Sequence, residues 1–242
     1  MYKPKPIHRF ESELVEVKDL TYNDKEFIFT VPEDFEFICG QFVSFLFEIE
    51  GKPLRRPYSI CSSPYELGEK NVISYAITKV ENGPGTTKLW NLTLGDKVNM
   101  MGPMGVFVLK DEFTENGMTF IGTGTGIAPF RSMIKELLNA GYEKPIRLFA
   151  GCRYLKTRLY HDEFVALSQK YPHFEYHSAV SQAETDHEHT TGRVTKLVEE
   201  FITKTDEGHF FMCGLYPMIK EVGSQLSGLG IPKERIHFER YD

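Results

Sequence analysis

The chain has 242 residues, a formal net charge of −6, 41% apolar residues and 26% charged residues. This length allows one large domain or two ordinary ones, and the composition is that of a globular protein. An acidic chain offers no electrostatic basis for nucleic-acid binding. No apolar run approaches the length that spans a bilayer, and the charged N-terminal segment precedes no apolar core. We therefore expect no membrane span, no secretory signal and a cytoplasmic location.

The four cysteines are far apart and form no C-x-x-C pair. Zinc sites and iron–sulfur clusters need clustered thiolates, and disulfides are rare in a reducing compartment. We expect no metal site and, in general, buried free thiols at Cys39, Cys61, Cys152 and Cys213.

Short segments rich in Val, Ile, Phe and Tyr fill the first part of the chain and are separated by turn residues. Their alternation predicts β-strands at Glu13–Leu20, Glu26–Val31, Phe42–Phe47, Val72–Val80 and Lys97–Met101. A single helix is predicted here, at Thr86–Leu92 after the turn N-G-P-G. Many short strands with one helix predict a closed antiparallel β-barrel.

After about Lys110, predicted strands alternate with predicted helices. The strands are Met118–Ile121, Ile146–Gly151, Phe174–Val180, His209–Cys213 and Arg235–Arg240. The helices are Ala128–Leu138, His161–Lys170, Val194–Thr203 and Tyr216–Leu226. This order predicts βαβ units and a parallel sheet covered on both faces. The polar segment 182–191, which contains His187 and His189, is interpreted as a solvated loop.

The boundary falls in the polar stretch Lys110–Gly117. We therefore expect two domains, an antiparallel Greek-key β-barrel over 1–112 and an α/β domain with a parallel sheet over 113–242.

The run I-G-T-G-T-G-I-A-P-F-R-S begins at Ile121 and is the first candidate ligand site. It lies between a predicted strand and a predicted helix, at the first βα turn of the second domain. Parallel sheets bind a dinucleotide pyrophosphate at this turn, on backbone N–H groups at a helix N-terminus. The third glycine, Gly126, comes one position too early for G-x-G-x-x-G, so a tight turn without a ligand stays open.

A second candidate site is R-R-P-Y-S-I-C-S-S-P, which begins at Arg55. An arginine can bind a diphosphate through two parallel hydrogen bonds. A tyrosine two residues later lies on the same strand face, where its ring can stack on a planar heterocycle. The segment N-G-P-G-T-T-K-L-W adds amides and threonine hydroxyls for phosphate oxygens. An ordinary barrel strand with a surface arginine is the alternative.

Five motifs then occur in order: R-P-Y-S, G-P-G-T-T, G-P-M-G-V-F, G-T-G-T-G-I-A-P-F-R-S and C-G-L-Y-P-M. Together they resemble the ferredoxin–NADP⁺ reductase family, from about Phe10 to Tyr241. The resemblance implies a barrel that binds FAD and an α/β domain that binds NADP(H), with NAD(H) also possible. Hydride would pass between nicotinamide and flavin, and electrons would leave singly.

The resemblance also implies roles for individual residues. The FAD site would comprise Arg56 on the pyrophosphate, Pro57, Tyr58 stacked on the flavin ring, Ser59 near its N5, Ile77, Thr78, Gly85, Thr86 and Thr87. Gly124, Thr125 and Gly126 would hold the nicotinamide dinucleotide, with Cys213 and Gly214 beside the nicotinamide. Ser59, Cys213 and Glu239 would form the catalytic cluster. Tyr241 would cover the flavin, although Asp242 follows it, whereas several relatives end in the tyrosine.

The choice of nucleotide depends on residues after the strands of the second half. No acidic residue occurs between the predicted strand Ile146–Gly151 and Asp162, whereas Cys152 and Arg153 follow the strand. The segment A-V-S-Q matches the family's A-V-S-R at Ser181 but has Gln182 where the family has arginine. Arg193 matches a second family arginine. Because arginines suit a 2′-phosphate, we expect NADP(H) to be preferred.

These observations predict a ferredoxin or flavodoxin–NADP⁺ reductase. Its expected partner is a separate ferredoxin or flavodoxin, which would dock on a local basic patch formed by Lys3, Lys5, Arg9, Lys52 and Arg55. The same residues would serve an NADH-dependent reductase component of an oxygenase system. A flavin-binding redox sensor or regulatory module without turnover is the alternative of another class. The direction of electron flow and the oligomeric state stay open.

Overall fold

The structure is a computed structural model that describes residues 5–68, 71–183 and 190–241. Its contacts divide the chain into two compact units. The first unit comprises Met1–Leu109 and Ala128–Ala140, and the second comprises Lys110–Ile127 and Gly141–Asp242. One helix is therefore grouped with the first unit although the chain on both sides of it belongs to the second.

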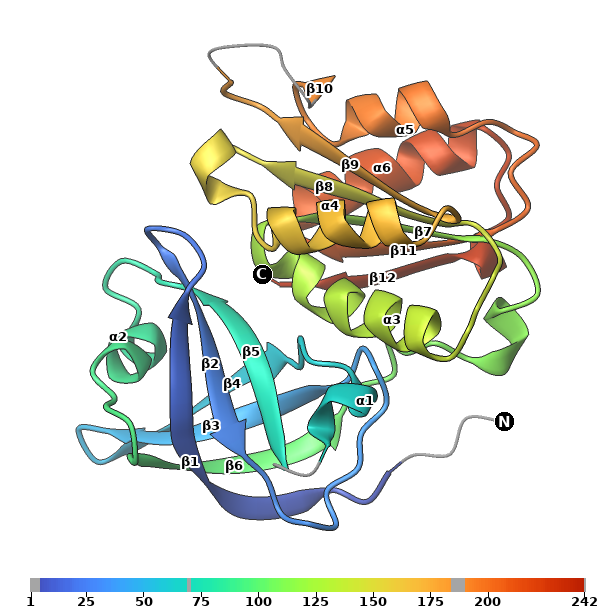
Figure 1. The fold of residues 1–242 in the computed structure, drawn as a ribbon. Coiled ribbons are helices and arrows are strands. Elements are labelled where there is room, and N and C mark those ends of the chain that lie inside the picture. The colour runs from blue at the N-terminus through green and yellow to red at the C-terminus, as the bar shows by residue number, and fades with distance from the viewer. Residues whose placement is uncertain (1–4, 69–70, 184–189, 242) are drawn as a thin grey trace. The chain divides into compact units, whose positions relative to one another are not determined.

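An antiparallel sheet of six strands forms most of the first unit (Figure 1). Its strands are β1 (His8–Asp19), β2 (Asp24–Thr30), β3 (Phe42–Ile49), β4 (Lys52–Ser59), β5 (Val72–Thr78) and β6 (Lys97–Met104). They are hydrogen-bonded in the order β4-β3-β6-β1-β2-β5. The two end strands approach each other after β4, where the Cys61 N–H donates to Ser74 O at 2.9 Å. The predicted antiparallel barrel is confirmed, although its ladder stays open between β4 and β5.

Aromatic side chains fill the inside of this barrel because alternate residues of each strand point inward. Phe45 is at the centre, with ring centroids 5.4 Å from Phe29, 4.9 Å from Tyr75 and 5.0 Å from Tyr58. Such edge-on contacts fix ring orientations as well as burying apolar area. The core thereby holds β4, the strand that carries the second candidate site, by its inward-facing tyrosine.

Two α-helices occur in the barrel part of the first unit, whereas the sequence predicted one. The predicted one is confirmed as α2 (Pro84–Trp90). The prediction of a single helix is wrong because Pro64–Leu67 forms a one-turn helix, α1. Ser63 and Glu66 form a capping box at its start, a signal that the sequence S-P-Y-E contains.

Glu66 also holds the helix α3 (Ala128–Asn139), which the contacts group with the first unit. Arg131 donates to Cys61 O at 2.9 Å and to the two Glu66 carboxylate oxygens at 3.3 and 3.4 Å, and Lys135 also donates to Glu66. The Arg131 side chain is only 9% exposed, so this carboxylate compensates a buried cation.

The second unit has a parallel sheet with the order β10-β9-β8-β7-β11-β12. The strands are β7 (Met118–Thr123), β8 (Ile146–Cys152), β9 (Phe174–Val180), β10 (Thr190–Thr191), β11 (His209–Gly214) and β12 (Ile236–Arg240). The helices are α4 (His161–Lys170), α5 (Thr195–Phe201) and α6 (Tyr216–Gly228). Short 3₁₀ helices occur among the described residues at Asp111–Phe113, Gly124–Ile127, Leu155–Thr157 and Lys233–Arg235.

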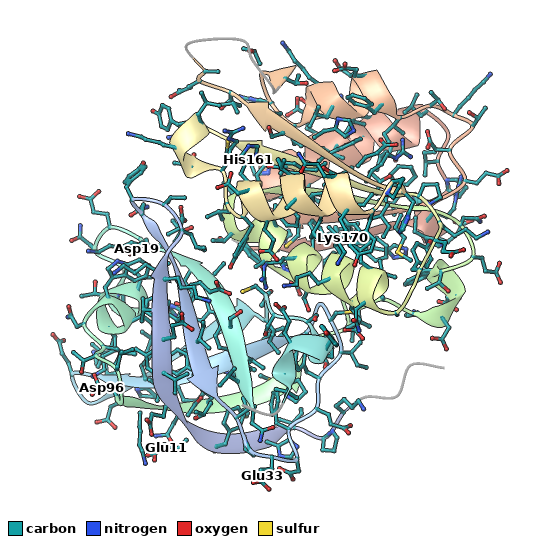
Figure 2. All side chains as sticks on the ribbon, in the orientation of Figure 1. Glu11, Asp19, Glu33, Asp96, His161 and Lys170 are labelled. Atoms are coloured by element: carbon teal, nitrogen blue, oxygen red, sulfur yellow. The ribbon has the colours of Figure 1, made fainter. Side chains whose placement is uncertain are left out.

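Helices of the second unit cover the two faces of its sheet as predicted (Figure 1). Phe164 of α4, whose ends His161 and Lys170 are labelled in Figure 2, packs on Phe174 and Tyr176. The helices α5 and α6 join a separate cluster with Phe149 and Phe210. All strands and helices predicted for this half are confirmed within a few residues.

The segment predicted as a solvated loop instead contains β10 at its end, paired with β9. His187 and His189 lie outside the described residues. Within the described ranges, the chain has no helix that combines the length and apolar character needed to cross a membrane.

A histidine pair joins the starts of β11 and β12. His209 Nδ1 lies 3.0 Å from His237 Nε2, and the ring of Phe113 contacts both imidazoles, at 4.7 and 4.4 Å between centroids. Burial lowers the pKa of both histidines, that of His237 to about 4. The charges of Arg235 on His209 and of Lys110 on His237 act in the same direction, whereas Glu112 opposes them.

We expect the second unit to lose stability as the pH falls from about 6.5 to about 4. An unfolded chain protonates both histidines near pH 6.5, whereas the folded pair resists protonation, so acid favours unfolding only within that window. His237→Phe keeps the ring contacts and binds no proton. Urea unfolding followed by circular dichroism at pH 7.5 and 5.0 measures the free energy of unfolding. The loss of this free energy on acidification should be smaller in His237→Phe than in the natural protein by roughly 1–2 kcal/mol, after allowance for partial exposure.

The matched control is His8→Phe, which replaces a histidine whose ring contacts Phe35 in the first unit. In this control variant, the acid-induced loss of unfolding free energy should equal that of the natural protein. An equal loss in the His237 variant and the natural protein would refute the assignment to this pair.

Candidate cofactor site

The alternation of β4 directs Arg56 and Tyr58 to one face of the strand. Tyr58 is half-buried, and its ring meets Phe45 edge-on at 5.0 Å. Burial raises the pKa of Tyr58 to about 12, against the lowering effect of the Arg56 charge. The phenol therefore stays neutral at physiological pH, as a ring that stacks on a heterocycle should.

Arg56 also reaches the start of α2. A Cβ placed on Gly85 would lie 3.0 Å from Arg56 Cγ and 3.7 Å from Cδ and Nε, so a larger residue would push the Arg56 side chain away from the helix start. The first amides of a helix have no intrahelical acceptor. The arrangement therefore combines a guanidinium with helix N-terminal amides, two groups that bind phosphate oxygens. Its residues fit the diphosphate of FAD.

The two threonines of this helix differ. Thr86 is buried, and its hydroxyl bonds to Val80 O, Val80 N and Gly83 O at 3.1–3.2 Å. Its side chain therefore shapes the turn, whereas Thr87 is exposed. On β5, the Ile77 side chain is in the barrel core, and Thr78 Oγ1 donates to Asp24 Oδ1 at 2.5 Å. These two residues can meet a ligand mainly through their main chain.

The glycine run of the second unit forms the 3₁₀ turn Gly124–Ile127 directly after β7. Gly124 has φ +54°, and a Cβ there would meet nothing within 4 Å, so this side of the loop is open. A Cβ on Gly126 would lie 2.3 Å from Cys213 O. The loop thus rests on the end of β11 by a backbone contact that tolerates no side chain at this position.

Cys213 and Glu239 are opposite each other on the paired strands β11 and β12. Cys213 is buried, and burial together with the Glu239 charge raises its pKa well above the ordinary value. The thiol is therefore protonated at neutral pH. Gly214 follows with φ +143°, and its carbonyl accepts a hydrogen bond from Tyr241 N at 3.1 Å. Ser59, the third predicted catalytic residue, is buried at the end of β4 in the first unit.

The residues expected to choose the nucleotide follow the strands β8, β9 and β10. The main chain brings Arg153 and Ser181 together, since Ser181 N donates to Cys152 O at 3.0 Å and Gln182 N donates to Arg153 O at 2.9 Å. Arg193 is 77% exposed, and its Nη1 lies 3.5 Å from Glu221. The carboxyl edge of this sheet is therefore cationic at Arg153, and partly neutralised at Arg193.

A pocket beside the glycine run contains residues that sequence reasoning missed. Its lining includes Gly124 and Cys152 together with Thr157, Arg158 and Tyr176. The segment R-Y-L-K-T-R, which begins directly after a strand and carries a second arginine at Arg158, was the available signal.

Comparisons with known proteins agree with this geometry. Residues 11–109 match the oxidoreductase FAD-binding domain family, and residues 120–223 match the oxidoreductase NAD-binding domain family. The ferredoxin–NADP reductase B of Sorangium cellulosum (strain So ce56) is 31% identical, over 96% of this chain and 98% of that protein. The chain belongs to the ferredoxin–NADP⁺ reductase family. This reductase is an FAD-dependent NAD(P)H oxidoreductase.

The chain is also similar to a relative with a different name and to a solved structure of a ferredoxin NADP⁺ reductase. The phenol hydroxylase P5 protein of Acinetobacter pittii (strain PHEA-2) is 31% identical, over 97% of this chain and 66% of that protein. A ferredoxin NADP⁺ reductase from Neisseria gonorrhoeae, crystallised with FAD and NADP, superposes with a TM-score of 0.83. That similarity, at 21% identity over 96% of this chain and 98% of that one, shows a shared fold.

We expect Arg56→Gln to lower the FAD content of the purified reductase, because the variant loses the cation beside the α2 amides. The affinity should fall about tenfold, the size expected for a lost charge-assisted contact, as measured by fluorescence titration of the apoprotein with FAD. Arg55→Gln removes the neighbouring charge, whose guanidinium contacts Met104 S instead, and should retain FAD. Equal affinities of both variants would refute the role of Arg56.

We expect Gly126→Ala to weaken dinucleotide binding while FAD content is retained. The added methyl group would collide with Cys213 O, so the loop must move away from β11. Titration of the oxidised flavin spectrum with NADP⁺ measures the loss. Gly228→Ala is the matched control, because a Cβ at this helical glycine meets nothing within 4 Å and its φ is not positive. Unchanged NADP⁺ binding in the Gly126 variant would contradict this account of the loop.

Proposed function

We propose that this protein is a ferredoxin or flavodoxin–NADP⁺ reductase that transfers hydride between NADP(H) and FAD and exchanges single electrons with the partner. The observation that carries the proposal is the cationic carboxyl edge of the nucleotide sheet. Arg153 directly follows β8, and no acidic residue occurs before Asp162 to bind a ribose 2′-hydroxyl group. Similarity to a ferredoxin–NADP reductase over nearly its whole length supports the same assignment.

In this proposal, residues of the barrel bind and orient FAD. Residues 1–112 form the FAD-binding part, and residues 113–242 form the nucleotide-binding part. Arg56 and the amides at Gly85 hold the diphosphate, and neutral Tyr58 stacks on the ring system, with Pro57, Ile77, Thr78, Thr86 and Thr87 completing the walls. Bound FAD accepts two electrons as hydride and releases them one at a time.

The residues near the proposed transfer site provide neutral and charged hydrogen-bonding groups. Ser59 donates its hydroxyl toward the flavin edge, and the Cys213 thiol, kept protonated by burial, contacts the nicotinamide without acting as a nucleophile. Glu239, opposite Cys213, supplies the carboxylate, and Tyr241 shields the flavin face. Holding the two reacting rings in contact makes the transfer effectively unimolecular.

In the nucleotide-binding part, different residues bind the groups that NAD(H) and NADP(H) share and the 2′-phosphate that distinguishes them. Gly124, Thr125 and Gly126 serve the pyrophosphate, and Gly214 leaves room beside the nicotinamide. Arg153, Ser181 and Arg193 surround the 2′-phosphate that only NADP(H) carries. Release of Arg193 from Glu221 is then part of binding, because the guanidinium cannot serve both anions fully.

The proposed partner is a small electron carrier of the ferredoxin or flavodoxin class. Exposed carboxylates, including Glu11 and Glu33, lie on the outside of the barrel (Figure 2), so an acidic partner needs a local basic patch. Among the candidate residues, Lys5 pairs with Glu36, and Lys3 lies outside the described residues. Arg9 lines a surface groove that also contains Glu11 and Glu48. Lys52 and Arg55, both exposed on β4, are the more favourable part of the patch.

A second candidate function is an NADH-dependent reductase component of an oxygenase system. Gln182 in place of a phosphate-binding arginine and the Arg193–Glu221 pair both lower the positive charge available to a 2′-phosphate. The similarity to a phenol hydroxylase P5 protein supports this candidate. A flavin-binding module without turnover is less well supported, because it needs no cysteine–carboxylate pair at the nucleotide strands.

Anaerobic titration of the flavin absorbance with NADPH and with NADH tests the proposal. We expect NADPH to bleach the flavin rapidly and NADH slowly, because Arg153 and Arg193 favour the nucleotide with the extra phosphate. Faster bleaching by NADH would favour the oxygenase reductase. A flavin that neither nucleotide bleaches would refute hydride transfer and leave a binding module.

A further inference from the structure

A small pocket lies within the second unit, at the carboxyl end of β8 and beside the glycine run. Gly124 and Ile127 line it from the 3₁₀ turn after β7, and Gly151 and Cys152 line it from β8. The other side comes from the loop residues Thr157, Arg158 and Leu159 and from Tyr176 of β9. The carboxyl ends of parallel strands are where such sheets bind dinucleotides.

The glycines keep this pocket accessible to a ligand. Gly124 has φ +54°, and a Cβ there would point into open space, so the loop backbone can approach a ligand closely. At Gly151, a Cβ would lie 2.8 Å from Thr123 Cγ2 and 3.0 Å from Val194 Cβ, so no larger residue fits. Gly151 thus packs closely against neighbouring side chains, whereas the loop at Gly124 leaves its side of the pocket open.

Arg158 provides the only charged side chain among the described residues that line the pocket. Its Nε donates to Leu155 O at 3.3 Å, which uses one of the five guanidinium N–H groups and anchors the side chain. None of these described lining residues carries a carboxylate. A guanidinium in such a place has the geometry and charge to bind a phosphate.

The charge of Arg158 acts on the pocket walls. Burial raises the pKa of Cys152 and raises the pKa of Tyr176 well above its ordinary value, while the Arg158 charge opposes both shifts. Among the groups that lower the pKa of Tyr176, Arg158 has the largest effect. Asp162, a carboxylate on α4, raises this pKa and has the smallest effect. The positive charge therefore faces the space that these two side chains border.

We propose that Arg158 binds the pyrophosphate of the nicotinamide dinucleotide, together with the amides of the glycine run at Gly124. This assignment rests on the proposed function, since it concerns the nucleotide of the same site. The pyrophosphate is favoured over the 2′-phosphate because Arg158 shares its pocket with Gly124, whereas Arg153 and Arg193 do not line it. Arg158 then contributes to affinity for both dinucleotides and not to the choice between them.

Calorimetric titration of the oxidised holoenzyme with NADP⁺ and with NAD⁺ tests this assignment. Both ligands carry the pyrophosphate, and only NADP⁺ carries the 2′-phosphate. We expect Arg158→Gln to weaken both by a similar factor of about ten, because a charge-assisted hydrogen bond is lost at a partly exposed site. Arg158→Lys keeps the charge and should recover part of the affinity.

Lys156→Gln is the matched control, since it removes one positive charge from the same loop at a residue that does not line the pocket. It should bind both dinucleotides as the natural protein does. Unchanged binding in Arg158→Gln, a loss confined to NADP⁺, or an equal loss in Lys156→Gln would each overturn the assignment. If the natural protein binds neither dinucleotide, the proposed function fails before the variants are compared.

Discussion

A backbone contact between the glycine run and the end of β11 constrains the whole nucleotide site. The carbonyl of Cys213 occupies the space that a side chain at Gly126 would need, and the Thr123 hydroxyl occupies the space that a side chain at Gly214 would need. One contact therefore positions two features at once, the amides offered to the pyrophosphate and the thiol offered to the nicotinamide. Their relative position is set by main chain, which is stiffer than any pair of side chains.

Charged and neutral side chains occupy different parts of the proposed cofactor sites in the two units. Guanidinium groups lie at the two places where the proposed function requires phosphates to bind, at Arg56 beside α2 and at Arg153 after β8. Groups beside the proposed ring-stacking sites are uncharged instead, because burial keeps the Tyr58 phenol and the Cys213 thiol protonated. Glu239, the carboxylate opposite Cys213, is the charged exception.

Most of the fold could be predicted because its strands and helices have strong local patterns. The exceptions share a physical cause. The helix α1 has a single turn held by Ser63 and Glu66, too short for any periodicity, and β10 has two residues that become a strand only by pairing with β9. The grouping of α3 with the first unit depends on Arg131 and Glu66, which are 65 residues apart in the chain. Only tertiary contacts reveal such a pair.

Site residues that belong to a sequence motif could be predicted. Residues were harder to predict where their side chains already bond to other groups of the folded chain. The motif placed Thr86 at a phosphate, but its hydroxyl is consumed by the turn before the helix. Arg193 was read as free to bind a 2′-phosphate, but the folded chain gives it Glu221 as a partner. Arg158 lies in no family motif. It becomes a candidate ligand-binding residue only in the folded chain, where it lines one pocket with Gly124 and Tyr176.

These corrections change how nucleotide preference should be understood in this chain. Contacts to the pyrophosphate are common to both dinucleotides, so their strength cancels when NADPH and NADH are compared, and only contacts to the 2′-phosphate discriminate. Two arginines remain for that task, and Arg193 must first give up an exposed ion pair. Because such pairs are worth about 1 kcal/mol or less, the exchange costs little, and the phosphate can compete for this guanidinium with success. Discrimination then depends mainly on Arg153, which directly follows its strand and has Gln182 bonded to its carbonyl.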